Sequence, residues 1–227
     1  MGLKSFGRVV APQLFLLCFA LAARSAEFSV KTADKPVPNA VGESIRGVLQ
    51  NKALQLVSGD KPAFEAWLRQ EVPLKSKPSG DALLAIPETT VMGVLSIQEK
   101  GMQDYKGNDI PPGTYTARFG LQPQDGDHLG TADFNSFLVL IPADSDKELN
   151  GIDKFKPMVK ASGKVTSSGH PVVISLRPAS GAGDSLSVTE PAPDHKAIRL
   201  KLPGKVSGGS DKADVSFDLV FQGKGHV

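Results

Sequence analysis

Cysteine is almost absent from this 227-residue chain. Its single cysteine, Cys18, lies in an apolar N-terminal segment that has the layout of a removable leader. If that segment is cut off, no cysteine remains, which excludes a disulfide framework, a zinc site with thiolate ligands and a thiol nucleophile. The remaining chain of about 200 residues must be held together by its hydrophobic core, and this length suffices for one domain of ordinary size.

An excess of either charge is also lacking. The whole chain has 26 basic and 24 acidic residues, and removing Lys4, Arg8 and Arg24 with the leader leaves 23 against 24. The two signs are interspersed along the sequence, and no basic patch with interleaved aromatic residues is present. The composition therefore excludes the usual surface of a nucleic-acid-binding protein.

Three common catalytic or ligand-binding patterns are missing as well. The chain has no Gly-x-Ser-x-Gly turn for a serine nucleophile. The glycines and the lysine of GKVTSSGH at 163–170 do not have the spacing of a phosphate-binding loop. The helix-flanked twelve-residue loop that holds calcium in many proteins is absent too. Nucleophilic catalysis therefore finds no support, and neither a phosphate-binding loop nor a helix-flanked calcium loop is indicated.

The first residues have the pattern of a secretory signal peptide. Lys4 and Arg8 precede an apolar run, and small residues follow it up to Ala26. The run from 12 to 23 is shorter than the roughly 20 apolar residues that a membrane-spanning helix needs. We therefore expect residues 1–26 to be cleaved, the protein to be exported to the periplasm or beyond, and the mature chain to have no transmembrane segment.

Short apolar runs separated by glycine and proline predict an all-β fold. The chain has 23 glycines and 17 prolines, and apolar and polar residues alternate in many runs, as on strands with one buried face. The run FLVLI at 137–141 is apolar throughout and suits a central strand covered on both sides. The segment 54–72 reads as a hairpin that turns over Gly59 and Asp60.

We expect these runs to form a mostly antiparallel β-sandwich or jelly roll of about 8–10 strands. A half-open barrel is the competing architecture, because periodicity does not separate the two. One short helix is expected near 150–162 and should start near Phe155, since Pro157 interrupts a longer one. Residues 27–227 are expected to form a single domain, of which 27–50 make a loose N-terminal arm or an edge strand.

Several motifs resemble a group of exported proteins from planctomycete-type bacteria. They are LQLVSGDKPAFEAWLRQEVP at 54–73, IPPGTYTARFGLQPQDGDHLG at 110–130, FLVLIPA at 137–143 and VKASGKVTSSGHPVVISLRP at 159–178. The resemblance covers roughly residues 50–180. It implies a secreted or periplasmic β-rich domain. It implies no activity, because the group has none assigned.

Two turns each carry a histidine that can ligate a metal ion. His128 follows Asp125 and Asp127 in DGDHLG, and His170 follows a turn in SSGHP. Neutral imidazole together with carboxylate is a ligand set for zinc, copper, iron or nickel. If the sheet brings the two turns together, these residues form a divalent metal site. Alternatively, the carboxylates only cap backbone amides of a turn, and His170 only leads into a strand.

Four further residues are candidate surface contacts for a ligand or partner: Trp67, Arg118, Gln122 and Gln124. An exposed tryptophan can stack on a sugar or anchor a partner, and the alternative is burial beneath a loop or a second layer. For Arg118 the alternative is a pairing with a neighbouring strand. Gln122 and Gln124 lie in 122–133, the most polar segment that follows a strong strand.

The sequence as a whole favours an exported binding or envelope-associated module without enzymatic activity. No motif specifies its small ligand or envelope partner. We expect recognition at loops on one end of the fold, because loops carry function while strands position them. The alternative is a metal-dependent enzyme or metal-binding protein that uses His128 and His170 with Asp125 or Asp127.

Overall fold

The computed structural model describes most of the chain that follows the predicted leader. The described residues are 28–98, 102–123, 134–166, 169–180 and 184–223. The strands are β1 (Phe28–Ala33), β2 (Ala53–Ser58), β3 (Lys61–Leu68), β4 (Val72–Leu74), β5 (Val91–Ile97), β6 (Gly113–Leu121), β7 (Ser136–Pro142), β8 (Val172–Pro178), β9 (Ser187–Ala192), β10 (His195–Val206) and β11 (Lys212–Gln222). The helical segments are α1 (Glu43–Arg46), η1 (Ala82–Ala85) and α2 (Phe155–Ser162).

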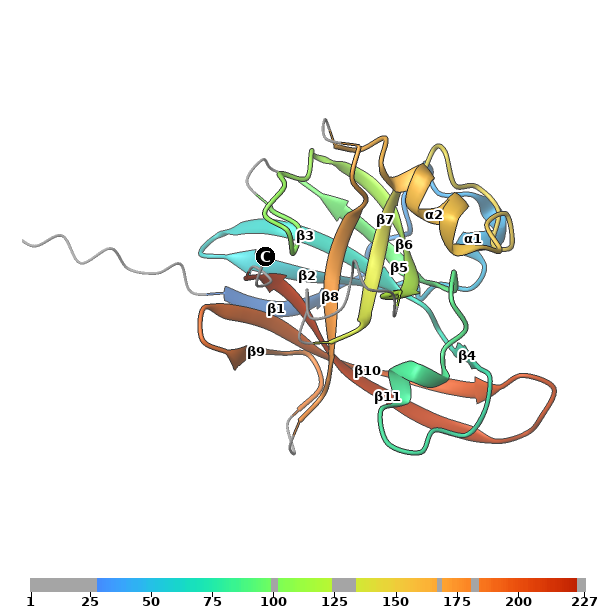
Figure 1. The fold of residues 1–227 in the computed structure, drawn as a ribbon. Coiled ribbons are helices and arrows are strands. Elements are labelled where there is room, and N and C mark those ends of the chain that lie inside the picture. Colours follow the sequence, from blue (N-terminus) through green and yellow to red (C-terminus); the bar gives the residue numbers. More distant parts are fainter. Residues whose placement is uncertain (1–27, 99–101, 124–133, 167–168, 181–183, 224–227) are drawn as a thin grey trace, which may run out of the picture.

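All eleven strands belong to one sheet that curls into a nearly closed barrel (Figure 1). Its main path runs β1-β2-β3-β5-β6-β7-β8-β11-β10-β4, and β9 pairs with β10 beside this path. Among the described strand pairs, only β10 and β4 run parallel. The expected all-β, mostly antiparallel class is confirmed, and the single curled sheet corresponds to the half-open barrel that competed with the sandwich.

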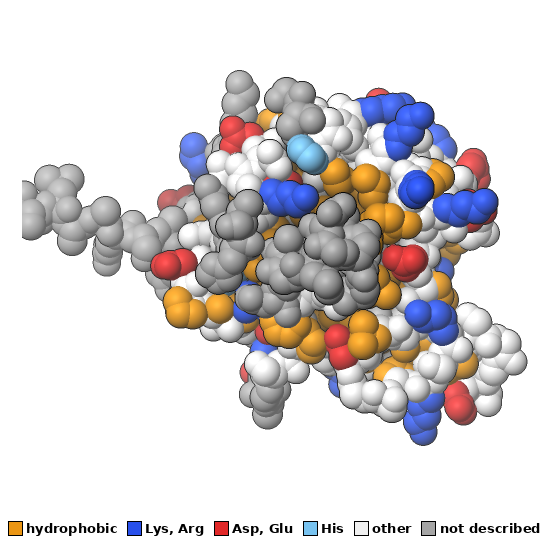
Figure 2. Space-filling view, in the orientation of Figure 1, with side chains coloured by type: hydrophobic (Ala, Val, Ile, Leu, Met, Phe, Trp, Pro, Cys, Tyr) orange, Lys and Arg blue, Asp and Glu red, His pale blue; other side chains and the backbone are white. Residues whose placement is uncertain are grey.

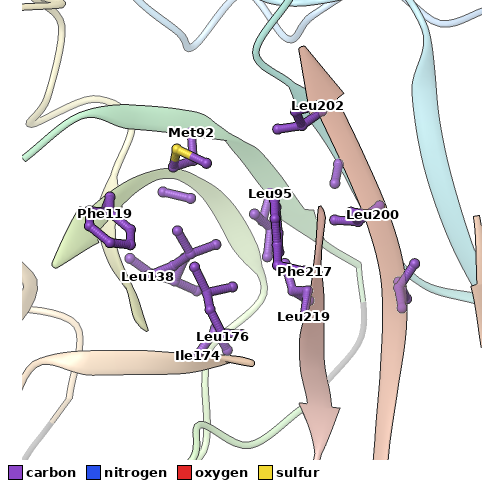
Figure 3. Close-up of a cluster of buried hydrophobic side chains, with 14 of the residues drawn as sticks. Met92, Leu95, Phe119, Leu138, Ile174, Leu176, Leu200, Leu202, Phe217 and Leu219 are labelled. Atoms are coloured by element: carbon purple, nitrogen blue, oxygen red, sulfur yellow. The ribbon is translucent and has the colours of Figure 1, made fainter. Parts of the chain in front are cut away.

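The hydrophobic core fills the inside of the curled sheet. On β6, Tyr115, Ala117 and Phe119 belong to this core, whereas the alternate residues Thr116 and Arg118 do not. Figure 3 shows core side chains from six strands meeting in the interior: Met92, Leu95, Phe119, Leu138, Ile174, Leu176, Leu200, Leu202, Phe217 and Leu219. Alternation along the strands therefore predicts the inward face correctly.

The helix α2 covers the outer face of β7. Val139 and Ile141 pack there against Met158 of the helix, while alternate residues of β7 point into the barrel. The apolar run FLVLI is thus covered on both sides, as expected. The helix predicted near 150–162 is confirmed, and Pro157 is its third residue, where a missing amide hydrogen costs no helical hydrogen bond.

The N-terminal segment begins as the edge strand that the sequence offers beside the loose arm, since β1 is the first strand of the sheet. Strand β1 pairs with β2 along its whole length. Beyond it, Val37, Val41, Ile45 and Leu49 are buried against the outer faces of β3 and β5. These apolar residues are separated by polar ones and by irregular backbone, so they leave neither a helical nor a strand period in the sequence. The segment forms a second layer over one flank of the barrel.

The surface carries both charge signs, in keeping with the near-neutral composition. Figure 2 shows acidic and basic side chains scattered around one face, with several basic ones near the corner where α2 lies. Lys156 and Lys160 of α2 are exposed. None of the helices in the described part of the chain is long and apolar enough to cross a membrane.

Candidate functional site

Four residues of the predicted sites, Gln124, Asp125, Asp127 and His128, lie outside the described residues. The metal site that combines Asp125, Asp127 and His128 with His170 therefore stays a prediction. Within the described ranges, no three histidine, cysteine, aspartate or glutamate side chains are grouped closely enough to hold a metal ion.

Two of the four described residues of the predicted sites, Gln122 and His170, lie near opposite ends of β7. The Gln122 amide donates to Asn135 O at 2.8 Å, just before β7 begins. His170 precedes β8, whose first residue Val172 pairs with Leu140 near the far end of β7. Since strand residues advance by about 3.3 Å each, most of the length of β7 separates the two positions.

Trp67 does not form a surface contact. Its side chain is 2 % exposed, and its indole Nε1 donates to Lys35 O at 2.9 Å. Val37 and Ile45 of the N-terminal layer pack in the same cluster. The alternative interpretation, burial beneath a second layer, is therefore the right one. The outer face of β3 is not solvated because a segment from elsewhere in the sequence covers it.

Arg118 does not form a surface contact either, and its partner is not a neighbouring strand. Its side chain is 1 % exposed. Nε and Nη2 donate to the two carboxylate oxygens of Asp146 at 2.7 and 2.8 Å. Nη1 donates to Thr89 O and Leu149 O at 2.8 and 3.2 Å, and Nη2 also donates to Glu148 O at 2.8 Å. All five guanidinium hydrogens therefore have acceptors.

The Arg118–Asp146 pair ties strand β6 to the segment before α2. Asp146 is 3 % exposed and also accepts the Thr116 hydroxyl at 2.6 Å. Removing one partner of such a buried pair typically costs about 3–5 kcal/mol, because the other charge is left uncompensated. The two residues are 28 positions apart in the sequence, so the pair fixes a tertiary contact rather than a local one.

The segment 144–150 is held from its other side by the residues around α1. Ser44 Oγ accepts the Leu149 amide hydrogen at 3.0 Å. The backbone of Gly42 lies so close to the backbone of Lys147 that a Cβ atom at position 42 would stand 1.8 Å from Lys147 O. Only glycine permits this approach of two backbones. The segment is therefore clamped between β6 and the N-terminal layer.

Thr89 has a backbone conformation that threonine rarely adopts. Its φ angle is +67°, in the left-handed region where a β-branched residue is a genuine outlier. The Thr89 amide donates to Phe119 O at 2.8 Å, and its carbonyl accepts the Arg118 Nη1 bond at 2.8 Å. Strain of about 1–3 kcal/mol persists only where the surroundings over-determine the backbone, and it clusters at functional sites. Thr89 therefore marks the adjoining surface as a candidate site.

A groove of about 290 Å³ adjoins Thr89 at the rim of the barrel, and we call it the rim groove. Three segments line it: 69–73 after β3, 87–91 leading into β5, and 149–153 before α2. The lining residues are Arg69, Pro73, Pro87, Glu88, Thr89, Thr90, Val91, Leu149, Asn150, Ile152 and Asp153. Arg118 thus reaches two of the three segments, through Thr89 O and Leu149 O.

The rim groove lies at the end of the barrel where β3 and β6 end and β5 begins. Leu68 pairs with Gly93 at this end. The Leu121 amide donates to Glu88 Oε1 at 3.2 Å, which joins the end of β6 to the groove wall. The segment 122–133 starts directly after Leu121. The groove is therefore next to the start of the loop that the sequence singles out.

The groove combines one guanidinium and two carboxylates with an apolar lining. Nε and Nη1 of Arg69 donate to Glu71 O and Val91 O at 2.9 and 3.2 Å. Burial lowers the pKa of Arg69 from its ordinary value, and the charge of Glu71 acts in the opposite direction. Glu88 and Asp153 are exposed. The apolar part comes from two prolines, a valine, a leucine and an isoleucine.

Sequence reasoning does not find the rim groove, because its lining residues form no motif. The stretch PETT at 87–90 contains no glycine or asparagine, the residues that usually announce a positive φ. Pro87 marks only a connection between elements. The groove arises where three segments distant in sequence meet, and no local signal reports such a meeting.

Comparison with known proteins adds no family to this description. No family model, no curated protein and no solved structure matches the chain. The resemblance to exported planctomycete proteins therefore stays a prediction.

Proposed function

We propose that this chain is an exported binding or envelope-associated module without enzymatic activity. It recognises its ligand with connecting segments at the end of the barrel where β6 ends and β5 begins. The observation that supports this proposal is the rim groove, one wall of which is the strained Thr89 held by the buried Arg118. A preformed concave surface with a few fixed polar groups is the usual form of a small-molecule site.

Binding is a better account of this groove than catalysis. No histidine, cysteine, lysine or tyrosine is among its described lining residues. The Thr90 hydroxyl donates to Pro87 O at 2.7 Å, so it is engaged with the backbone rather than with a base. A nucleophile in hydrogen-bond contact with a base is the usual sign of covalent catalysis, and the described groove residues do not form one.

Export follows from the N-terminal pattern of residues 1–26 and accords with the resemblance described above. Expression of the full chain in a bacterial host, followed by fractionation, tests it. We expect the mature protein outside the cytoplasm, with an N-terminus near Glu27. Recovery of the uncut chain from the cytoplasm alone would contradict this part of the proposal.

Binding at the rim groove can be tested by amide NMR titration of the full chain. The probes are maltose, chitobiose, the dipeptide Ala-Leu and zinc, copper and calcium chlorides. We expect at least one organic probe to shift the Thr89, Thr90 and Asn150 amides. We expect Asn150→Trp to abolish these shifts by filling the groove, because Asn150 lines it and is exposed.

Ser29→Trp is the matched control, because Ser29 is exposed on β1. It pairs with Val57, which lies beside the start of β3, whereas Arg69 follows the end of β3. This variant should leave every shift unchanged. The proposal fails if no organic probe shifts the three groove amides, or if the shifts survive Asn150→Trp. Stoichiometric metal binding that raises the melting temperature would instead support the metal-dependent alternative.

A further inference from the structure

Arg69, the arginine of the rim groove, has one guanidinium nitrogen, Nη2, that makes no hydrogen bond to the described residues. Nε and Nη1 of Arg69 are bonded to backbone carbonyls, but Nη2 has no acceptor among the described residues, and Arg69 lines the groove. A guanidinium that is partly fixed by its own backbone loses little freedom when it binds an anion. Arg69 is thus a prepared receptor for a carboxylate.

Neither carboxylate of the groove has a cationic partner in the described part of the chain. Glu88 accepts the Leu121 amide hydrogen through Oε1, and this bond holds the side chain at the groove wall. No lysine, arginine or histidine of the described residues lies within ion-pair distance of Glu88 or Asp153. The groove therefore offers negative charge to a ligand cation as well as positive charge to a ligand anion.

The remaining surface of the groove suits an apolar side chain and not a sugar ring. The apolar lining residues are Pro73, Pro87, Val91, Leu149 and Ile152. No aromatic residue is among the described lining residues, although aromatic rings are the usual platforms on which sugars stack. The volume of about 290 Å³ is at the lower limit of small-ligand sites, which start near 300 Å³.

From these features we infer that the rim groove binds a short peptide of two or three residues with both termini free. The terminal carboxylate pairs with Arg69, the terminal ammonium pairs with Glu88 or Asp153, and an apolar side chain covers the proline and aliphatic lining. A ligand with only one charge would leave one of these groups unpartnered. This inference rests on the proposed binding function and names the ligand class for the same site.

Four forms of one dipeptide test the inference by amide NMR titration of the full chain. They are Ala-Leu with free termini, N-acetyl-Ala-Leu, Ala-Leu amide and N-acetyl-Ala-Leu amide, so that each charge is removed separately. We expect the free dipeptide to bind most tightly. Each blocked terminus should weaken binding about fivefold, the effect of one partly exposed ion pair.

Two variants assign the charges to residues. Glu88→Gln together with Asp153→Asn should remove the preference for a free amino terminus and keep the preference for a free carboxylate. Arg69→Gln should do the reverse. Because Arg69 also bonds to backbone carbonyls, Arg69→Lys serves as a second variant that keeps the charge and loses the fork. Asp60→Asn, in the exposed turn between β2 and β3, is the control and should change nothing.

The outcomes separate this inference from the proposed function. Equal binding of all four dipeptides, or tightest binding of the doubly blocked form, overturns the ligand class. Groove shifts caused by maltose or chitobiose but by no dipeptide overturn the ligand class and leave the binding function standing. The absence of groove shifts with every organic probe overturns both.

Discussion

Two arginine–aspartate pairs on the outer face of the sheet differ in what they connect. Arg118 of β6 pairs with Asp146, which lies in the segment before α2. Arg199 of β10 pairs with Asp218 of β11, with two parallel bonds of 2.9 and 3.0 Å between residues that are directly opposite in the sheet. The first pair joins separate layers, and the second joins strands that are already paired.

The two pairs have different roles: the Arg118 pair positions segments of the rim groove, whereas the Arg199 pair only stabilises the sheet. Arg118 also binds carbonyls of Thr89 and Leu149, which line the rim groove. The side chain of Arg199 is hydrogen-bonded to Asp218. This hydrogen bonding is the largest of the effects that raise the pKa of Arg199 above its ordinary value. Loss of the first pair should therefore deform the groove, whereas loss of the second should only weaken the sheet.

The largest effect is expected from Asp146→Ala. It leaves the buried Arg118 charge without a partner, so the free energy of unfolding should fall by about 3–5 kcal/mol. Urea denaturation followed by tryptophan fluorescence measures this loss, since the single tryptophan, Trp67, is buried beneath the adjoining layer. A loss below about 1 kcal/mol, the value of an exposed pair, would contradict the structural role of Asp146.

Gly42→Ala should be nearly as costly. Its new Cβ atom would stand 1.8 Å from Lys147 O, so the segment 144–150 must move, at a cost of about 3 kcal/mol. Gly47→Ala is the matched control, because a Cβ atom there meets nothing closer than 3.6 Å and its φ is −61°. The control should be neutral or stabilising by up to about 1 kcal/mol. Equal losses of unfolding free energy in both variants would contradict the close contact between Gly42 and the segment 144–150.

Asp218→Ala should have an intermediate effect on stability and none on the groove. Removing the two charged hydrogen bonds to Arg199 should cost about 2 kcal/mol in urea denaturation. The Thr90 and Asn150 amide resonances should keep their wild-type positions. Displacement of those resonances to the extent seen in Asp146→Ala would show that the two pairs act alike.

The smallest effect on stability is expected from Thr89→Gly. Glycine relieves the strain of a positive φ but loses a buried side chain and gains freedom in the unfolded chain, so the net change should stay within about 1 kcal/mol. The groove wall should nevertheless loosen, which amide hydrogen exchange at Thr90 and Val91 can detect. Full retention of exchange protection there would mean that the Thr89 side chain has no part in shaping the groove.

The strands were predictable because their signal is local. Alternation in β6 places Tyr115 and Phe119 inside, and the same alternation predicts that Arg118 faces water. That second prediction is wrong, since residues 144–150 and the N-terminal layer cover this face. Burial of the second face of a strand depends on contacts between residues far apart in the sequence, and alternation carries no information about them. The rim groove is formed by three segments distant in sequence, so it could not be predicted from the sequence for the same reason.

Hydrogen exchange of Arg118→Lys and Arg199→Lys tests the central claim most directly. Both variants keep the positive charge and lose the guanidinium fork, so they differ only in which pair is weakened. We predict that Arg118→Lys accelerates exchange in 87–91 and 146–153 together, while Arg199→Lys leaves both segments as protected as in the wild type. Native protection of both segments in Arg118→Lys would contradict the claim that this arginine positions the rim groove.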